Sequence, residues 1–468
     1  MSEVAEAVAV KHVPLSEAAE INPKVDRTLL EDDTLVSFVP MAAVGAADGR
    51  IDVSTTRPYA EVKKGYTAFR NGDVLFAKVT PCMENGKMAV ARNLSNGQGF
   101  GSTEFHVLRP REGVDSSYLY HFVSSASFRN EAARHMTGAV GLRRVPSAFL
   151  QDELIPLPEL DEQRRIVAEI DKQFSRLDEA VANLQGVKAN LKRYKASVLK
   201  AAVEGRLVET EATLARREGR SYETGVQLLQ RIAECRRQQW VGRGKYKEAQ
   251  SNWTGSRKDV PDGWCWTTVN DLAVKIVDGT HHTPTYVDEG IPFISVKDIR
   301  ESRISFEATR LISAAEHDEL SKRCNPEFGD VLITKSGTIG RTAIVATTTP
   351  FSLFVSVALI KPVKGIVDPK YLMLTLDAYI QSIDISQDVK GGLLKNLHLE
   401  DLRLISVQLP PAAEQVRIVA EVDRHLSVLR GVEAEVDANL LRAQVLRQSV
   451  LTSFLGGNNG QANSFLSG

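Results

Sequence analysis

The stretch EQRRIVAEID, residues 162–171, returns as EQVRIVAEVD at residues 414–423, 252 positions further along the chain. At the same offset, and without a gap, the similarity runs on to Gly205 and Gly457, and Leu-Pro stands shortly before each copy. Such a period is far longer than the roughly 20–50 residues of solenoid repeats and fits a duplicated domain pair. The sequence therefore predicts an internal duplication with pseudo-two-fold character.

A weaker repetition precedes each copy. GDVLFAKV at residues 72–79 matches GDVLITKS at residues 329–336, and SFVPMAAV at residues 37–44 matches PFISVKDI at residues 292–299 in pattern. Each GDVL block predicts a strand, a polar loop that contains glycine, and a second strand. We therefore expect a mixed α/β chain in which each copy is a variable, strand-rich domain followed by one long helix.

Behind each quoted stretch an apolar residue recurs every seven positions, the pattern of a helix that packs along its length against a partner helix. In the first helix, Phe174 and Val181 lie four positions after the heptad residues Ile170 and Leu177. Val187 and Tyr194 lie three positions after the heptad residues Leu184 and Leu191. About 44 helical residues would span roughly 66 Å. The predicted seam consists of Ile170, Leu177, Leu184, Leu191 and Val198 in the first helix and Val422, Leu429, Val436, Ala443 and Val450 in the second.

Each long helix has an obvious partner in the other, because two copies of one unit associate about a two-fold axis in isologous pairs. Helices related by such an axis run antiparallel. We therefore expect two globular domains separated by an antiparallel pair of coiled-coil helices. An ordinary helical hairpin inside a core is the alternative, and the length of the seam together with the repeat argues against it.

These patterns divide the chain into six segments. Residues 209–259 are charged, rich in Arg and Gln and low in aromatic residues, which indicates a helix followed by a flexible linker. The closing stretch GGNNGQANSFLSG has the composition of a disordered tail. The expected segments are a first variable domain (1–156), the first long helix (157–208), the charged linker (209–259), a second variable domain (260–408), the second long helix (409–457) and the tail (458–468).

The composition is that of a soluble globular protein, with 43% hydrophobic and 25% charged residues and no apolar run long enough to cross a bilayer. The N-terminus lacks the basic start and apolar core of a signal peptide, so we expect a cytoplasmic protein without membrane attachment.

Cys82, Cys235, Cys265 and Cys324 are widely spaced, which disfavours disulfides and a zinc site. Residues 162–259 hold 21 Lys and Arg against 13 Asp and Glu, within a chain of net charge −1. Charge alone therefore gives no argument for DNA binding.

No catalytic motif stands out. A methyltransferase would need a glycine-rich loop after a strand and an Asn/Asp-Pro-Pro-aromatic loop, and KSGTIGR at residues 335–341 lacks the Gly-Lys-Ser/Thr of a P-loop. Residues 61–63 have the spacing of a nuclease E-x-K element without a well-placed partner carboxylate. His281 and His282 are adjacent, so an extended strand cannot direct both to one metal. We predict no catalytic residues, no cofactor site and no metal site in this chain.

The motifs closely resemble those of the specificity (S) subunits of Type I restriction–modification enzymes. The strongest match is IPLPELDEQRRIVAEID at residues 155–171 with its second copy VQLPPAAEQVRIVAEVD at residues 407–423. VPDGWCWTTVNDL at residues 260–272 resembles the start of the family's second domain, and KASVLKAAVEGRL at residues 195–207 the end of its first helix. The resemblance covers nearly the whole chain, from about residue 12 to 457. A lone EQxxIV would be weak, whereas two copies, each between a Leu-Pro and a heptad helix, are specific.

The resemblance implies a function and its partners. In that family each variable domain is a target recognition domain that reads one half of a split, asymmetric DNA site. The paired helices act as a ruler and dock two methyltransferase (M) subunits, and restriction (R) subunits join that core. This chain would choose the sequence on double-stranded DNA without catalysis of its own, and partner subunits would hold S-adenosylmethionine, ATP and Mg. Because the two variable domains differ, we expect the two half-sites to differ.

The residues expected to meet DNA are polar and basic residues of loops that follow predicted strands. Arg, Lys and Asn can form paired hydrogen bonds to guanine or adenine, and hydroxyl groups suit bases or phosphates. A solvated loop residue is the alternative for each. TGAVGLRR at residues 137–144 and KGGLLKN at residues 390–396 are glycine-containing turns in matching places. The candidates are Lys78, Thr80, Asn85, Lys87, Arg143 and Arg144 in the first domain and His281, His282, Thr283, Lys335, Ser336, Thr338, Arg341, Lys395 and Asn396 in the second.

Three residues at the start of the first long helix, Gln163, Arg165 and Glu169, are predicted to face outward and to dock the methyltransferase subunits, with a solvated helix face as the alternative. Two other functions stay open. A scaffold that carries two non-DNA binding modules on a coiled-coil spacer predicts no sequence-selective DNA binding in any assembly. A self-contained restriction or modification enzyme predicts methyltransferase activity of this chain alone, and the absent cofactor and acceptor loops argue against it.

Overall fold

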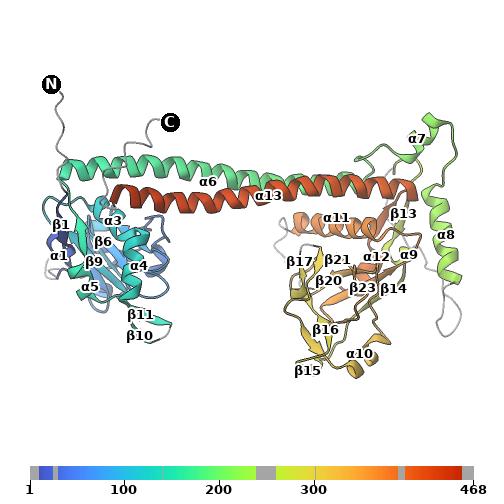
Figure 1. The fold of residues 1–468 in the computed structure, drawn as a ribbon, viewed down its shortest axis with the longest axis horizontal. Helices are drawn as coiled ribbons and strands as arrows, with labels where there is room; N and C mark the ends of the chain where they lie inside the picture. The colour runs from blue at the N-terminus through green and yellow to red at the C-terminus, as the bar shows by residue number, and fades with distance from the viewer. Residues whose placement is uncertain are drawn as a thin grey trace. The chain divides into compact units, whose positions relative to one another are not determined.

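A computed structural model shows two compact units, of which one contains Met1–Gly186 with Val436–Gly468 and the other Val187–Glu435. Figure 1 labels their helices and strands. The described residues are 10–24, 30–139, 141–238, 260–300, 302–387 and 396–455.

The first unit contains two four-stranded sheets. One has the order β2-β9-β6-β7 and is antiparallel throughout. The other has the order β4-β3-β8-β5, and its central pair, β3 and β8, is parallel. A short ribbon joins β1 to β12 near the start of the first long helix, and β10 pairs with β11. The strands are β1 (His12–Pro14), β2 (Ala19–Ile21), β3 (Leu35–Val39), β4 (Thr56–Pro58), β5 (Thr67–Arg70), β6 (Val74–Ala77), β7 (Met88–Val90), β8 (Gln98–Gly101), β9 (Phe105–Pro110), β10 (Thr137–Ala139), β11 (Leu142–Arg144) and β12 (Leu154–Pro156).

Side chains of the central strand β6 alternate between two cores, as the two-residue period of a strand requires. Val74 and Phe76 pack against the helices, whereas Leu75 and Ala77 pack against the second sheet. The strand is therefore apolar at every position and is covered on both faces. The helices of this unit are α1 (Leu15–Ala18), α2 (Tyr59–Val62), α3 (Ser116–Ser124), α4 (Ala126–Arg134), α5 (Ser147–Asp152) and one part each of α6 (Leu160–Val203) and α13 (Ala412–Leu455), with the 3-10 turns η1 (Met41–Ala43) and η2 (Ser95–Gly97).

The second unit repeats this plan. Its first sheet has the order β14-β23-β20-β21, its second sheet β15-β19-β16-β22 with β16 and β22 parallel, and β13 pairs with β24. The strands are β13 (Cys265–Thr268), β14 (Ala273–Asp278), β15 (Tyr286–Val287), β16 (Ile291–Ile294), β17 (Ile299–Arg300), β18 (Arg303–Ile304), β19 (Arg310–Ile312), β20 (Val331–Thr334), β21 (Thr342–Ile344), β22 (Ser352–Leu353), β23 (Val357–Pro362) and β24 (Ser406–Leu409). The other elements are α9 (Val269–Leu272), η3 (Val296–Asp298), α10 (Ala314–Ser321), α11 (Pro369–Gln387) and α12 (Leu399–Leu404).

The two units differ at one edge of the second sheet. The edge strand β5 of the first unit pairs with β8, whereas the edge strand β15 of the second unit pairs with β19, on the other side of the parallel pair. The first sheets correspond strand for strand. The predicted mixed α/β duplication is thus confirmed, and the predicted strand-loop-strand blocks are the antiparallel pairs β6-β7 and β20-β21.

The aspartate of each repeated GDVL block is buried and ion-paired. Arg109 on the neighbouring strand β9 forms two hydrogen bonds of 2.8 Å with Asp73. At the equivalent place on β23, Lys361 Nζ lies 2.8 Å from Asp330. A buried carboxylate is stable only when it is paired and hydrogen-bonded, so the charge on the adjacent strand is what permits this aspartate. The pairing explains why the block is repeated with its Asp intact.

Both long helices have 44 residues, and each runs from one unit into the other. Within the first unit, Arg447 of α13 pairs with Asp178 of α6 at 2.6 Å and lies 4.1 Å from the ring centroid of Phe174. Within the second unit, Tyr194 Oη of α6 lies 3.0 Å from Nδ1 of His425 of α13. In each unit the beginning of one helix therefore lies beside the end of the other, as antiparallel helices do (Figure 1).

The ten predicted seam residues are all buried or half-buried along α6 and α13. Val187 and Tyr194, which the sequence places three positions beyond the seam, are 40% and 46% exposed. An apolar stripe this narrow is typical of a two-helix seam, because two facing helices can cover little more than one row of side chains on each other.

Residues 209–238 form two helices, α7 (Glu211–Glu218) and α8 (Gly225–Gln238), where the sequence predicted one helix followed by a linker. Leu228 and Ile232 of α8 are fully buried and share a core with Val198 and Leu199 of α6. Leu228, Leu229, Ile232 and Cys235 have helical spacing, but polar and charged residues dominate the composition of residues 209–259, which favoured a solvated segment. The rest of the predicted linker, residues 239–259, and the predicted tail lie outside the described residues.

Candidate nucleic-acid interface

Lys78 and Lys335 occupy the same place in the two units, directly after β6 and β20. The backbone carbonyl of Lys78 accepts a hydrogen bond of 2.9 Å from the Val145 N–H, and that of Lys335 accepts one of 2.8 Å from the Leu397 N–H. The next residues form isolated β-bridges, Val79 with Arg144 and Ser336 with Asn396. In each unit the structure thus brings together two candidate segments that are far apart in sequence.

In the first unit, the candidate segments hold each other through Thr80 and Arg143. The Thr80 N–H donates to the Arg143 carbonyl at 3.0 Å, and the Arg143 N–H donates to Thr80 Oγ1 at 3.0 Å. The Arg143 side chain is exposed and lies 3.7 Å from Glu84, which leaves its guanidinium available to a ligand. Asn85 is exposed on the same loop, and its backbone N–H donates to the Pro81 carbonyl.

Two basic candidates of this unit are engaged within the protein. Arg144 forms two hydrogen bonds with Glu104, of 2.6 and 2.9 Å, and this bonding lowers the pKa of the Glu104 carboxyl. Lys87 Nζ donates to the carbonyl oxygens of Met41 and Val44 at 3.1 and 2.8 Å. Lys87 therefore ties two loops together, and of the two Arg144 is the better placed to reach a ligand, because its side chain is 42% exposed.

In the second unit, Lys335 lies against a buried carboxylate. Lys335 Nζ is 2.7 Å from Asp278, the last residue of β14. Arg323 lies 2.5 Å from the same carboxylate and His281 3.4 Å. Burial raises the pKa of Asp278, but the Lys335 hydrogen bond and the surrounding positive charge outweigh burial and lower it. Asp278 is thus ionised at neutral pH and holds three cationic or potentially cationic groups together.

The remaining candidates of the second unit surround this cluster with varied exposure. His282 contacts Thr280 Oγ1 at 2.8 Å, and Thr283 is exposed. Thr338 is exposed, with its carbonyl accepting from Thr334 Oγ1, and Arg341 donates to the Ile299 carbonyl at 3.2 Å. Asn396 is exposed beside Ser336, and Lys395 lies outside the described residues.

A model of the family described as the Type I restriction modification DNA specificity domain matches residues 8–193 and 262–437. The chain belongs to this family. It is a specificity subunit, the DNA sequence-recognition component of a Type I restriction–modification system, and the component that does no catalysis. The resemblance seen in the repeated EQ motif is thereby confirmed, and the scaffold alternative is not favoured.

Known specificity subunits match most of its length. It is 26% identical to the Type I restriction enzyme EcoEI specificity subunit of Escherichia coli over 491 residues, 91% of this chain and 79% of that one. The EcoAI specificity subunit of Escherichia coli is 27% identical over 470 residues, 87% of this chain and 76% of that one. A chain described under "Structural basis underlying complex assembly and conformational transition of the type I R-M system" has the same fold, with a TM-score of 0.65 at 21% identity over 96% of this chain and 98% of that one. The HsdS subunit from Thermoanaerobacter tengcongensis has a TM-score of 0.52 at 22% identity over 97% and 98%.

One predicted docking residue of this specificity subunit is wrongly placed. Gln163 is fully buried, not outward-facing. Its side chain accepts from the Asp115 N–H at 2.9 Å and donates to the carbonyls of Gly113 and Pro158 at 3.0 and 2.8 Å. The loop before α3 covers this face of α6, which the local sequence of the helix does not show. Arg165 is exposed and forms two bonds of 2.7 Å with Glu162. Glu169 is half-buried beside Lys172 and Gln173.

The motifs set aside in the sequence have structural roles. Val62 is buried within α2, Glu61 is exposed, and Lys63 lies 2.7 Å from Asp32, so the E-x-K element is one turn of a helix. Within the described ranges, no three His, Cys, Asp or Glu side chains are arranged to hold a metal ion. The helices of the described ranges include none that has both the length and the apolarity of a membrane span. A specificity subunit holds no catalytic cofactor of its own.

Sequence reasoning missed Glu104, Asp278 and Arg323, which organise the two basic clusters. Asp278 is the last residue of the strand AVKIVD, directly before Gly-Thr, and its place at a strand end is the one local signal that the sequence gives. Arg323 follows α10, 45 residues later, and no local pattern connects it with Asp278. The missed contacts are long-range, which is why the spacing of residues along the chain did not indicate them.

Proposed function

We propose that each variable domain of this specificity subunit reads one half of a split, asymmetric DNA site. The observation that carries the proposal is the pair of equivalent β-bridges, Val79 with Arg144 and Ser336 with Asn396. The same backbone arrangement, here called the frame, occurs in both domains, and the side chains on it differ. Equal frames with unequal side chains are suited to reading two different half-sites, because base edges in the major groove are distinguished by their donors and acceptors.

The exposed candidates on these frames are the proposed base-reading residues. Arg143 in the first domain offers paired donors, which suits guanine, whereas Asn85 in the first domain and Asn396 in the second each offer a donor beside an acceptor, which suits adenine. Thr283 and Thr338 offer hydroxyl groups that suit bases or phosphates. Phosphate contacts carry much of the affinity for DNA, and we propose that partner subunits supply part of them, since the chain as a whole has a net charge of −1.

The long helices are the proposed spacer and docking surface. Each has 44 residues and so a length of roughly 66 Å. Exposed apolar side chains that lie close together on a helix surface favour contacts with other proteins. On α13 they are Val416, Val428, Val432, Leu441, Val445 and Leu446. We propose that two methyltransferase subunits dock along the helix pair and that restriction subunits join them in the cytoplasm. S-adenosylmethionine, ATP and Mg would be held by these partners.

The deciding experiment compares methylated adenines in the genomes of two hosts. Both express the cognate methyltransferase subunit, and one lacks this chain. The proposal expects a two-part asymmetric motif that disappears in the second host. A chimera that takes residues 1–155 from another specificity subunit should change one half of the motif and leave the other half intact.

Point variants sharpen this experiment. Arg143→Ala should relax the motif in the half read by the first domain, and Asn396→Ala in the other half, because each removes one paired contact worth about 1–3 kcal/mol of discrimination. Arg134→Ala is the matched control, since it also removes an exposed arginine of the first domain that pairs with a neighbouring glutamate. Unchanged methylation in the host without this chain would refute the proposal and favour a scaffold role.

A further inference from the structure

The cluster around Asp278 contains more positive charge than a structural ion pair requires. The carboxylate is 3% exposed, and Lys335, at 16% exposure, already lies 2.7 Å from it. Arg323 and His281 contact the same carboxylate with side chains that are 54% and 62% exposed. In the described part of the chain, Asp278 is the single carboxylate in contact with any of the three. One negative charge therefore faces two permanent cations and one imidazole.

A fourth basic residue holds the segment that carries Arg323. Lys275, on the same strand β14, donates from Nζ to the backbone carbonyl of Arg323 at 2.6 Å. This bond holds the backbone of Arg323 against β14. A single ion pair would be enough to hold β14 against the segment after α10. Two further exposed cations at the same carboxylate are expected where the surface binds an anion.

We propose that Lys335, Arg323 and His281 form a clamp for a phosphate of the DNA backbone, and that Asp278 is the positioning residue that holds them. The inference rests on the proposed function, since it names the contact by which the second domain grips DNA. Its two exposed members reach out from a carboxylate that is itself buried at a strand end, so their heads are held in place before DNA arrives. A fixed guanidinium loses less side-chain entropy on binding than a free one.

The first domain is built differently at the same place. There the carboxylate is Glu104, which is 27% exposed and forms a two-bond pair with Arg144. Lys78, the equivalent of Lys335, adds a weaker electrostatic interaction to Glu104. Glu104 lies in the turn before β9. Asp278 instead ends β14, whose counterpart in the first domain is β2. The clamp is thus a property of the second domain, and a phosphate contact of this kind is expected on one half-site only.

The test uses the specificity subunit assembled with its methyltransferase subunits and a duplex that carries the target motif. Binding is measured over a series of salt concentrations for the native assembly and for Arg323→Ala. Removal of one phosphate contact should lower the slope of log K against log salt by about 0.9 and weaken binding roughly tenfold near physiological salt. The loss should be the same on target and on unrelated duplex, because phosphates carry no sequence information.

Lys364→Ala is the matched control for Arg323→Ala. Lys364 is also a half-exposed cation with a carboxylate partner, Glu327. It follows β23 at the end opposite to Ala358, the residue that pairs with Asp278. An identical salt slope for Arg323→Ala and Lys364→Ala would overturn the clamp.

A second pair of variants tests the positioning role of Asp278. Asp278→Asn adds one net positive charge, so general electrostatic attraction alone predicts tighter binding. The clamp predicts weaker binding, by about fivefold, with partial recovery in Asp278→Glu, which restores the charge. Tighter binding of Asp278→Asn would show that the carboxylate only neutralises its neighbours.

These results are separable from the proposed function. If the native assembly binds target and unrelated duplex equally, the half-site proposal fails, whatever the variants do. If the native assembly is selective and Arg323→Ala keeps the native slope and affinity, the clamp alone fails.

Discussion

Gln163 and Gln415 have the same role in the two halves of the molecule, whereas the glutamates directly before them do not. Both glutamine side chains are buried, and each donates to the carbonyl of the proline ahead of its helix, Pro158 at 2.8 Å and Pro410 at 3.1 Å. The bond is local, since it joins residues five positions apart. It depends on nothing outside the repeat, and so both copies make it.

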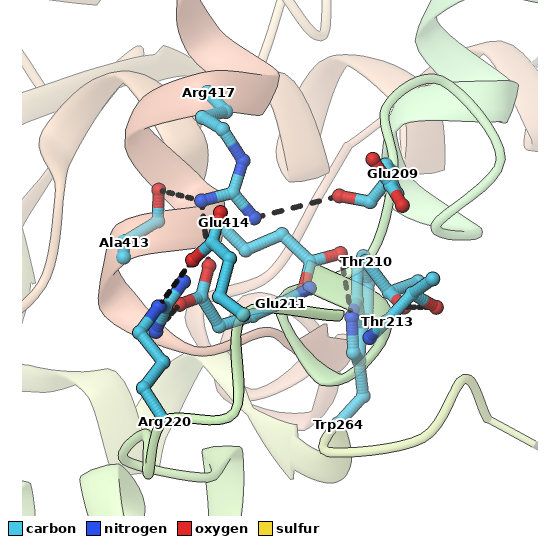
Figure 2. A network of polar contacts seen from close by, with 10 residues as sticks. Glu209, Thr210, Glu211, Thr213, Arg220, Trp264, Ala413, Glu414 and Arg417 are labelled. Carbon is cyan, nitrogen blue, oxygen red and sulfur yellow. Dashed lines mark hydrogen bonds and ion pairs between the residues drawn. The ribbon is translucent and has the colours of Figure 1, made fainter. Parts of the chain in front are cut away.

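Glu162 and Glu414 differ because of what packs against them. Glu162 is 35% exposed and pairs with Arg165 on its own helix. Glu414 is fully buried and accepts hydrogen bonds from the Trp264 indole N–H at 2.9 Å and from the Glu211 N–H at 2.8 Å (Figure 2).

Arg417, the counterpart of Arg165, bonds Glu211 at 2.6 Å instead of the glutamate on its own helix. Arg220 binds the same carboxylate at 2.6 Å (Figure 2). Burial works to raise the pKa of Glu211, but the two arginines outweigh burial and lower it. Helix α7, which the first unit lacks among its described residues, thus turns a surface motif into an internal network.

The largest difference between the copies should appear when these glutamates are removed. Glu414→Ala leaves the Trp264 and Glu211 N–H groups buried without acceptors, so we expect a loss of about 3 kcal/mol in the stability of the second unit. Glu162→Ala removes an exposed pair and should change stability by less than about 0.5 kcal/mol. Hydrogen exchange of the α7 amides measures the first loss directly. Equal protection of α7 in both variants would contradict the buried network.

Removal of either glutamine should also lower stability, by less than removal of Glu414. Gln163→Ala removes three hydrogen bonds and leaves the Asp115 N–H without an acceptor, for an expected loss of about 2 kcal/mol. Gln415→Ala removes the single bond to Pro410 and should lose about 1 kcal/mol. Urea unfolding, followed separately for each unit by hydrogen exchange, checks both values. Gln173→Ala, which removes one hydrogen bond to the Glu169 side chain at a half-buried position of α6, serves as the control, and a loss of equal size there would refute the role of the two buried glutamines.

A third comparison concerns Asp377 on α11, whose counterpart on α3 is Ser124. Burial raises the pKa of Asp377 to about 6, although Thr342 Oγ1 donates to it at 2.7 Å. A raised pKa means that the folded chain favours the protonated acid, so stability falls as pH rises from about 4 to 6 and stays lower above that range.

Asp377→Asn should therefore stabilise the second unit by about 1 kcal/mol at pH 8 and change nothing at pH 4, once partial exposure of the side chain is allowed for. Melting temperatures at the two pH values provide the measurement. A loss of stability at both would mean that the Thr342 bond needs the carboxylate. Ser124→Ala, which introduces no charge change, should show the same shift at both pH values.

Much of this architecture could be predicted because it is local. The seven-residue spacing of apolar side chains determines which face of α6 and α13 is covered, and the GDVL blocks determine two strand pairs. Both patterns are contained in short windows of sequence. The equivalence of Arg144 and Asn396 was also visible, since it follows from the repeat offset.

The rest depends on contacts between distant residues. In the helix pattern alone, Gln163 and Glu414 resemble surface residues. In the fold, the loop that ends at Asp115 covers Gln163, and α7 covers Glu414. Arg323 reaches Asp278 across 45 positions. Helix periodicity indicates which positions share a face, but not which faces a later segment covers. Site residues are therefore harder to predict than elements, because a binding surface is assembled from several distant segments.

The smallest expected difference lies at the end of the repeated stretch, at Asp171 and Asp423. Asp423 pairs with Lys370 of α11 at 2.7 Å, and both side chains are more than half exposed. Asp423→Ala should change stability by less than about 0.5 kcal/mol, as exposed ion pairs do. Asp171 lies 3.4 Å from His121, whose ring is buried on α3, so Asp171→Ala takes away the carboxylate that faces a buried imidazole. We expect Asp171→Ala to lower stability by about 1 kcal/mol in the native chain. In a double-mutant cycle, the same substitution should cost much less in the His121→Leu background. Equal losses of stability in Asp171→Ala and Asp423→Ala would mean that burial of the partner does not determine how much an ion pair contributes to stability. That result would contradict the explanation given for the difference between Glu162 and Glu414.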